Sequence, residues 1–316
     1  LDPRRDPAIV VSASRLEALG RCPLRYLHGT VLGIHPPDDP ELDPDRWLDP
    51  LRRGALLHGV YEVTLREARA RGLRAGDPAF EQLALGALAA GIARVQAEMP
   101  VPGEGALRRE TLALQNDVRA FVRMIEERGA PWVALELKFG LAGDDPVTRE
   151  VDGGTLRLRG AVDRVDEDLS GLHVIDYKTG VARDYAGTGA FHGGRRLQHA
   201  IYAHAVEQRL GGRVVRGVYQ YPTIRGENQV EPFDRLSLAG ASTLLGHLLD
   251  GVAEGRFVPT ESAEDCRFCD FAPICRVRVG TWNKVESPLA AWAEEHLNAG
   301  LWPAFENLKR ARTFES

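Results

Sequence analysis

Hydrophobic and polar positions divide the chain into a helical part and a part rich in strands. A first helix is expected to start near Ser12, and apolar residues then recur at helical spacing in three longer segments, 52–72, 78–98 and 106–129. Alternating or short apolar runs predict strands at 132–139, 147–152, 155–166, 173–177 and 214–221. Helices are expected at 196–210, 235–254 and 281–312. This order predicts an α/β protein.

The same pattern predicts five segments. They are an N-terminal segment at 1–50, a helical region at 51–130, an α/β core at 131–256, a cysteine-rich segment at 257–280 and a C-terminal helix at 281–316. Residues 1–11 are expected to be an extended lead-in, and the loop at 34–50 is rich in Pro and Asp. Because the sequence begins with leucine, we expect a domain taken from a longer protein.

The strand ending in Asp176-Tyr177-Lys178 carries the candidate chemistry. Asp176 and Lys178 are two residues apart, so they share one face of a strand. Taken alone, such a pair is usually an exposed salt bridge. A hairpin turning between residues 168 and 169 would place Asp163 opposite Val174 and diagonal to Asp176. Two neighbouring carboxylates repel unless a cation lies between them, and oxygen ligands suit Mg²⁺ or Mn²⁺.

Two predicted helices carry further polar residues. His58 lies in the segment 52–72, where a lone histidine is more often a surface or core residue than a metal ligand. Gln198 and Tyr202 are four residues apart, so they share one face of the predicted helix. Taken alone, such a face is a polar stripe on the outer side of the helix. Glu136 lies on the first core strand, where an exposed glutamate on an edge strand is expected.

The order of His58, Asp163, Asp176-Tyr177-Lys178 and then Gln198 and Tyr202 resembles the PD-(D/E)xK nuclease superfamily, in particular its RecB-like exonuclease branch. The resemblance implies a restriction-endonuclease-like core, a mixed sheet flanked by helices, with a helical insertion before it. It also implies that His58, Asp163, Asp176 and the backbone carbonyl of Tyr177 bind Mg²⁺ or Mn²⁺. Lys178 would position water or stabilise developing charge, and Gln198 and Tyr202 would face the site. Glu136 resembles the acidic residue that some members of the branch carry on the first core strand.

The four cysteines, Cys22, Cys266, Cys269 and Cys275, form a second candidate site. Without a secretory signal, cysteines at two places indicate metal binding more than disulfides. Their spacing alone slightly favours zinc over an iron–sulfur cluster. The chain resembles AddB-type and CRISPR-associated exonucleases, and this resemblance implies a [4Fe–4S] cluster. Such a cluster would join the first helix to a segment more than 240 residues away.

Charge and composition qualify this picture. The net charge of −5 over 316 residues requires that any DNA contact be local, and Arg52, Arg53, Arg195 and Arg196 are the candidates near the motifs. No signal peptide or apolar run of membrane-spanning length is evident, so a cytoplasmic, bacterial-type protein is expected. The sequence has no G-x-x-x-x-G-K-[ST] loop, so a helicase would have to lie elsewhere.

The resemblance, together with these residues, implies a metal-dependent DNA nuclease, an exonuclease on single-stranded ends in repair or recombination, working alone or within a helicase–nuclease. One alternative is a non-catalytic scaffold that binds DNA or a helicase partner. Intact Asp163, Asp176 and Lys178 argue against it. The other is a regulatory or binding protein in which the cysteines bind a structural zinc ion and Asp163 and Asp176 are merely exposed.

Overall fold

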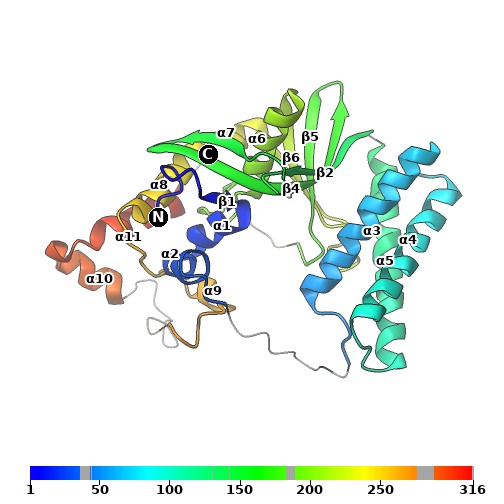
Figure 1. Ribbon diagram of the computed structural model, residues 1–316, viewed down its shortest axis with the longest axis horizontal. Coiled ribbons are helices and arrows are strands. Elements are labelled where there is room, and N and C mark those ends of the chain that lie inside the picture. The colour runs from blue at the N-terminus through cyan, green and yellow to red at the C-terminus, as the bar shows by residue number, and fades with distance from the viewer. Residues whose placement is uncertain are drawn as a thin grey trace.

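The computed structural model describes most of the chain. The described residues are 1–35, 43, 45–129, 131–141, 143–182, 189–275 and 288–314. Figure 1 shows a central sheet with one group of helices on each side.

The sheet is mixed and has seven strands. They are β1 (Val10–Ser12), β2 (Trp132–Phe139), β3 (Val147–Val151), β4 (Gly154–Asp168), β5 (Gly171–Tyr177), β6 (Val214–Gln220) and β7 (Val230–Asp234). The long strand β4 pairs with β1, β2, β3 and β5, and β5 continues through β6 to β7. Among the described strands, only the β1–β4 and β5–β6 pairs are parallel. The mixed sheet flanked by helices confirms the predicted fold class.

Strand β1 was not expected, since residues 1–11 were predicted to be an extended lead-in. It pairs in parallel with the first half of β4, placing Val11 beside Leu158. The apolar run from Ile9 to Val11 is the local signal for it. Ser12 then caps the following helix and accepts a hydrogen bond from the backbone N–H of Arg15.

Helices cover both faces of the sheet. Those before β2 are α1 (Ala13–Arg21), α2 (Pro23–Tyr26), the π-helix η1 (Leu27–Val31), α3 (Pro50–Arg71), α4 (Pro78–Glu98) and α5 (Glu104–Arg128). Those after β5 are α6 (Gln198–Leu210), α7 (Arg235–Ala239), α8 (Ala241–Ala253), α9 (Ala263–Cys266), α10 (Pro288–Glu295), the 3-10 helix η2 (Leu297–Ala299) and α11 (Trp302–Arg312).

Alternation along β5 separates two hydrophobic cores. Val174 packs with residues of α1, α6 and α8, whereas Ile175 and Tyr177 pack with α3, α4 and α5. The helices α3 to α5 therefore form an arm that covers one side of the sheet, drawn in blue to cyan in Figure 1. A third, smaller core joins α10 and α11 around Phe305.

The hairpin between β4 and β5 was predicted two residues out of register. Val165, not Asp163, pairs with Val174, because the strands are joined by a two-residue turn between the paired Asp168 and Gly171. Continued past the Arg164–Ile175 pair, this register places Asp163 directly across from Asp176. The shift is even, so each side chain keeps its predicted face.

Two helical predictions also differ from the structure. The single helix expected at 281–312 is replaced, within residues 288–314, by α10 and α11 with η2 between them. The helix expected at 235–254 is divided at Gly240 into α7 and α8.

The stretch Arg235–Ala253 has the length and composition to cross a membrane, which was not expected from the sequence. This is weak evidence for a span, since a core helix passes the same test, and Leu244, Leu245 and Leu249 of α8 are buried in the core.

Candidate active site

Three strands bring carboxylates together at one end of the sheet. Glu136 lies between the pairs that join β2 to β4, Leu135–Arg164 and Leu137–Val162, and so faces Asp163. Asp163 in turn lies across from Asp176 of β5. The backbone N–H of Tyr177 donates a hydrogen bond of 2.7 Å to the Oδ2 atom of Asp163, which fixes that carboxylate against the end of β5.

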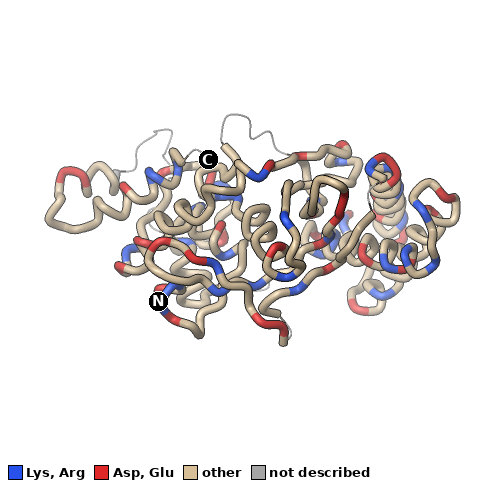
Figure 2. The backbone as a smooth tube through the Cα atoms, turned by 90° about the horizontal axis from the view of Figure 1, so that it is seen from above, with Lys and Arg blue, Asp and Glu red and all other residues tan. Residues whose placement is uncertain are grey.

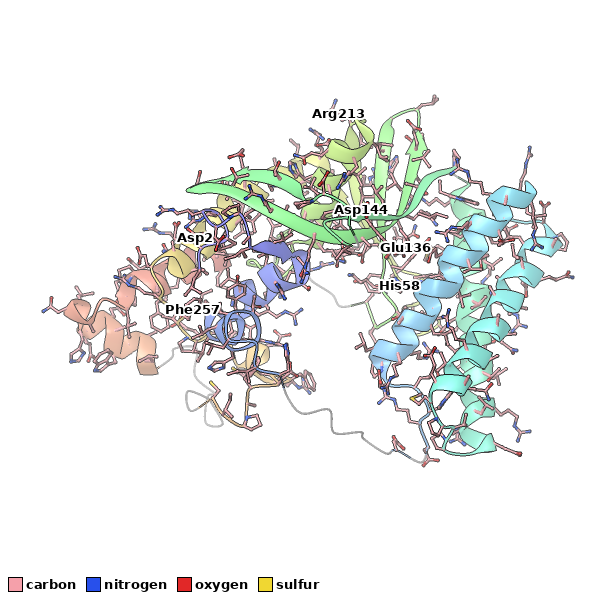
Figure 3. All side chains as sticks on the ribbon, in the orientation of Figure 1. Asp2, His58, Glu136, Asp144, Arg213 and Phe257 are labelled. Carbon is pink, nitrogen blue, oxygen red and sulfur yellow. The ribbon has the colours of Figure 1, made fainter. Side chains whose placement is uncertain are left out.

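His58 completes this group from helix α3. Its Nδ1 atom lies 3.3 Å from Oδ1 of Asp163, and one ligand atom each of His58, Glu136 and Asp163 lies within 4.8 Å of the other two. Figure 3 shows His58 and Glu136 between α3 and the sheet. Two oxygen ligands of one Mg²⁺ are at most about 4.2 Å apart, because each is about 2.1 Å from the ion. The three side chains therefore fit a divalent cation after small adjustments.

Glu136 was expected to be exposed on an edge strand, but it faces the other two ligands. Its φ of 46° lies in the left-handed region that residues other than glycine rarely adopt. Such backbone strain costs about 1–3 kcal/mol and gathers at functional sites. The local pattern of residues carries little signal for this role, because the alternation along β2 does not reveal a left-handed backbone at Glu136.

Asp176 and Lys178 form the second half of the site. The Nζ atom of Lys178 lies 2.6 Å from Oδ2 of Asp176 and donates a hydrogen bond of 2.6 Å to Oε1 of Gln198. Gln198 donates from Nε2 to the hydroxyl of Tyr202 at 3.0 Å. The predicted shared face of Gln198 and Tyr202 therefore points toward Lys178, although Tyr202 lies behind Gln198 in the core. Asp176 thus contacts Lys178 and does not belong to the compact group around His58.

Crowding of charge perturbs the pKa values of this group. Burial and the charge of Asp163 raise the pKa of Glu136 to about 7. Burial raises the pKa of Asp176 to about 6, although the neighbouring Lys178 opposes the shift. For His58, burial disfavours the charged form, but the hydrogen bond and charge of Asp163 outweigh it and the pKa is raised. Each shift favours proton uptake, so the group holds excess negative charge that a metal cation could neutralise.

We expect the metal-free protein to become more stable as the pH falls from about 8 to about 5. The raised pKa values of Glu136, Asp176 and His58 mean that the folded state binds more protons than the unfolded state in this range, so stability is lost as pH rises. Thermal unfolding in EDTA across this range measures the effect. Mg²⁺ added at pH 8 should restore the lost stability. A stability that increases from pH 5 to pH 8 in EDTA would contradict this account.

A cleft of about 840 Å³ opens over these residues. It is lined by His58, Glu136, Asp163, Lys178 and Gln198, and by residues of α1 and of the loop before α6. This volume is typical of small-molecule sites. Figure 2 shows basic and acidic positions interspersed along the chain.

The predicted DNA-binding arginines divide into two pairs. Arg195 and Arg196 line the cleft, whereas Arg52 and Arg53 do not. Arg53 instead forms ion pairs with Glu110 and Asp117 of α5. Arg21 also lines the cleft, and among the described residues its side chain forms no ion pair. Arg21 is therefore better placed than Arg52 or Arg53 to meet a phosphate in the cleft.

The four cysteines lie around a second, small pocket. Cys22, Cys266, Cys269 and Cys275 are all free, half-buried thiols that line it. Burial and the other three thiols raise the pKa of Cys266 to about 11, as expected of crowded sulfur ligands without a metal. The structure thus brings together four thiols from the two ends of the sequence, as a metal centre requires.

Contacts around the cysteines reach the cleft, which the sequence did not indicate. Asp265 precedes Cys266 and pairs with Arg195 of the cleft at 2.7 and 2.8 Å. It also accepts hydrogen bonds from Thr260 and from Arg312 of α11. Arg195 is therefore held by the cysteine-rich segment, although 70 residues separate the two partners in the chain.

Comparisons with known proteins show the family of this chain. One subunit of the ATP-dependent helicase/deoxyribonuclease of Symbiobacterium thermophilum is 30% identical over 251 residues, which cover 71% of this chain and 20% of that protein. The chain thus spans about one fifth of this relative. A solved structure, that of SSO0001, is 16% identical and covers 60% of this chain and 76% of its own, but its TM-score of 0.31 is too low to bear on the fold. The PD-(D/E)XK nuclease superfamily matches residues 10–276, and the chain belongs to that superfamily.

Proposed function

We propose that this chain is a metal-dependent deoxyribonuclease that removes nucleotides from single-stranded DNA ends. The observation that carries the proposal is the meeting of His58, Glu136 and Asp163 with the Asp176–Lys178 pair in one cleft. The superfamily consists of nucleases that hydrolyse phosphodiesters, which supports the reaction class. The DNA substrate is supported by the name of the Symbiobacterium thermophilum relative.

His58, Glu136 and Asp163 would hold Mg²⁺ or Mn²⁺, with Asp176 and the carbonyl of Tyr177 completing the site. A bound divalent cation would polarise the phosphate and lower the pKa of a water molecule. Lys178, held between Asp176 and Gln198, presents a charged ammonium to the attacking water or to the developing negative charge. Burial opposes this charge, but Asp176 outweighs it and raises the pKa of Lys178, so the side chain stays protonated.

The cleft could receive the end of a single strand. Its volume of about 840 Å³ lies in the range of small-molecule sites, which agrees with the entry of a few nucleotides. Arg21, Arg195 and Arg196 line it and would meet the phosphates. Arg196 is also bound to Glu231 by two hydrogen bonds of 2.5 and 2.6 Å, so its position is fixed before any ligand arrives.

The same chain would hold a [4Fe–4S] cluster through Cys22, Cys266, Cys269 and Cys275, with zinc as the alternative. The convergence of all four thiols on one pocket supports a metal centre, and the resemblance of their spacing to that of AddB-type exonucleases supports the cluster. Its role would be to fasten the N-terminal helices to the C-terminal segment. The match to one fifth of a helicase/deoxyribonuclease subunit supports a chain that works as the nuclease part of a larger helicase–nuclease in repair or recombination.

Degradation of end-labelled DNA tests the nuclease. We expect single-stranded DNA to be cut with Mg²⁺ or Mn²⁺ and not with EDTA, and the position of the label on the products gives the polarity. Lys178→Ala should slow cutting by about 10²-fold, the usual loss when one charge-stabilising group is removed. Lys309→Ala, on α11, is the matched control, because Lys309 lies over Trp302 in the helix and does not line the cleft. A folded wild-type protein that does not cut single-stranded DNA with either metal would overturn the proposal and favour the scaffold.

A further inference from the structure

The N-terminus of α6 is capped from a distant part of the chain. The residue at its N-cap position, Leu197, has no side chain that can accept a hydrogen bond from the first turn. Instead, Oε1 of Glu17 accepts hydrogen bonds from the backbone N–H groups of Leu197, at 2.8 Å, and Gln198, at 3.0 Å. Glu17 lies on α1, 180 residues earlier. A carboxylate at this end also interacts favourably with the helix dipole.

Close packing holds Glu17 in this position. Helix α1 contacts the loop before α6 at Gly20, where an added Cβ atom would lie 1.8 Å from the carbonyl oxygen of Gly194. Only glycine permits this approach. Arg312 of α11 binds the carbonyl oxygens of Gly20 and Gly193, and so fastens the two segments together from the other side. The contact between Glu17 and α6 is therefore built into the fold.

Glu17 is also close to the reacting groups. It lines the same cleft as Lys178 and Gln198. The first residue of α6 that it holds is Gln198, whose side chain accepts the hydrogen bond from Lys178 at 2.6 Å. We propose that Glu17 is a positioning residue of the nuclease site, which fixes the first turn of α6 and thereby the Gln198 side chain that orients Lys178. This inference rests on the proposed nuclease function.

Two substitutions separate the acceptor role of Glu17 from its charge. Glu17→Gln keeps an oxygen that can accept both N–H groups, and Glu17→Ala removes it. We expect Glu17→Ala to lower kcat on single-stranded DNA by at least tenfold with KM within about twofold, because misplacing a catalytic group by about 1 Å can cost up to 10²-fold in rate. Glu17→Gln should retain kcat within about threefold.

Asp234→Ala is the matched control, because Asp234 caps α7 through the backbone N–H of Ser237 at 2.9 Å and does not line the cleft. It should leave kcat unchanged. Hydrogen exchange of the Leu197 and Gln198 amides gives a readout that needs no cutting. Both amides should exchange faster in Glu17→Ala than in the wild type, and Glu17→Gln should restore most of the protection.

The outcomes are distinguishable. If the wild type cuts DNA and Glu17→Ala cuts equally fast, the positioning role is wrong. The same holds if Glu17→Gln fails to rescue kcat, or if KM rises while kcat is kept. A wild type that does not cut DNA overturns the proposed function, and with it the positioning role of Glu17. Unchanged amide exchange in Glu17→Ala overturns the contact between Glu17 and the first turn of α6.

Discussion

Replacing Asp163 by asparagine is expected to reduce DNA cleavage by at least about 10³-fold, since a catalytic metal contributes several kcal/mol and each 1.36 kcal/mol is tenfold in rate. Asp163 lies at the centre of the site, with Glu136 and Asp176 on the neighbouring strands and His58 3.3 Å away. Asparagine keeps the shape and can still accept the N–H of Tyr177. It removes the negative charge that binds the cation.

The fold should survive this change. The variant relieves repulsion within the acidic group, so in the absence of metal its thermal stability at pH 8 should equal or exceed that of the wild type. Its stability should also depend less on pH between 5 and 8, because Asp163 contributes to the raised pKa values of Glu136 and His58. These measurements separate loss of chemistry from loss of structure.

Asp168→Asn is the matched control for this experiment. Asp168 belongs to the same hairpin, but it is exposed at the turn, where it binds Ser170 and His173. Its replacement should leave cleavage within about twofold, as usual for surface changes away from a site. Cleavage by Asp163→Asn at more than a tenth of the wild-type rate would remove Asp163 from the metal site.

Short-range patterns accounted for much of the fold and the core of the site. The interval between Asp176 and Lys178 puts them on one strand face, and the interval between Gln198 and Tyr202 puts them on one helix face. Both relations depend only on local geometry. The predicted hairpin register was wrong by two residues, because the register depends on the length of the turn. A shift of two residues leaves every side chain on the same face of the strand, so the alternating pattern does not reveal it.

Relations between distant segments could not be predicted. Glu136 reaches the site through a strained backbone that no local pattern encodes. Glu17 and Asp265 look like ordinary helical acids in the sequence, yet they bind groups 180 and 70 residues away. The cysteines were found because their rarity and spacing indicate a metal site, but the contacts that join them to the cleft depend on tertiary packing.

The second large effect is expected from Cys22→Ser. A cluster that joins Cys22 to Cys266 closes a loop of about 244 residues, the difference between the two residue numbers. By the chain-entropy relation used for cross-links, such a closure is worth about 5 kcal/mol. For a chain of this size, that loss corresponds to a decrease in Tm of roughly 10 °C. The wild type should be brown with broad absorption near about 400 nm, since zinc is d¹⁰ and colourless, and the variant should lose most of this absorption.

Arg25→Ala is the matched control, because Arg25 joins the same two segments through an ion pair of 3.0 Å with Asp270. This pair is partly exposed, so its loss should cost less than about 1 kcal/mol and leave the absorption unchanged. A colourless wild type with one zinc per chain would replace the iron–sulfur cluster by zinc. If Cys22→Ser kept both its absorption and its Tm, Cys22 would not be a ligand, and the N-terminal helices would be held by packing and ion pairs alone.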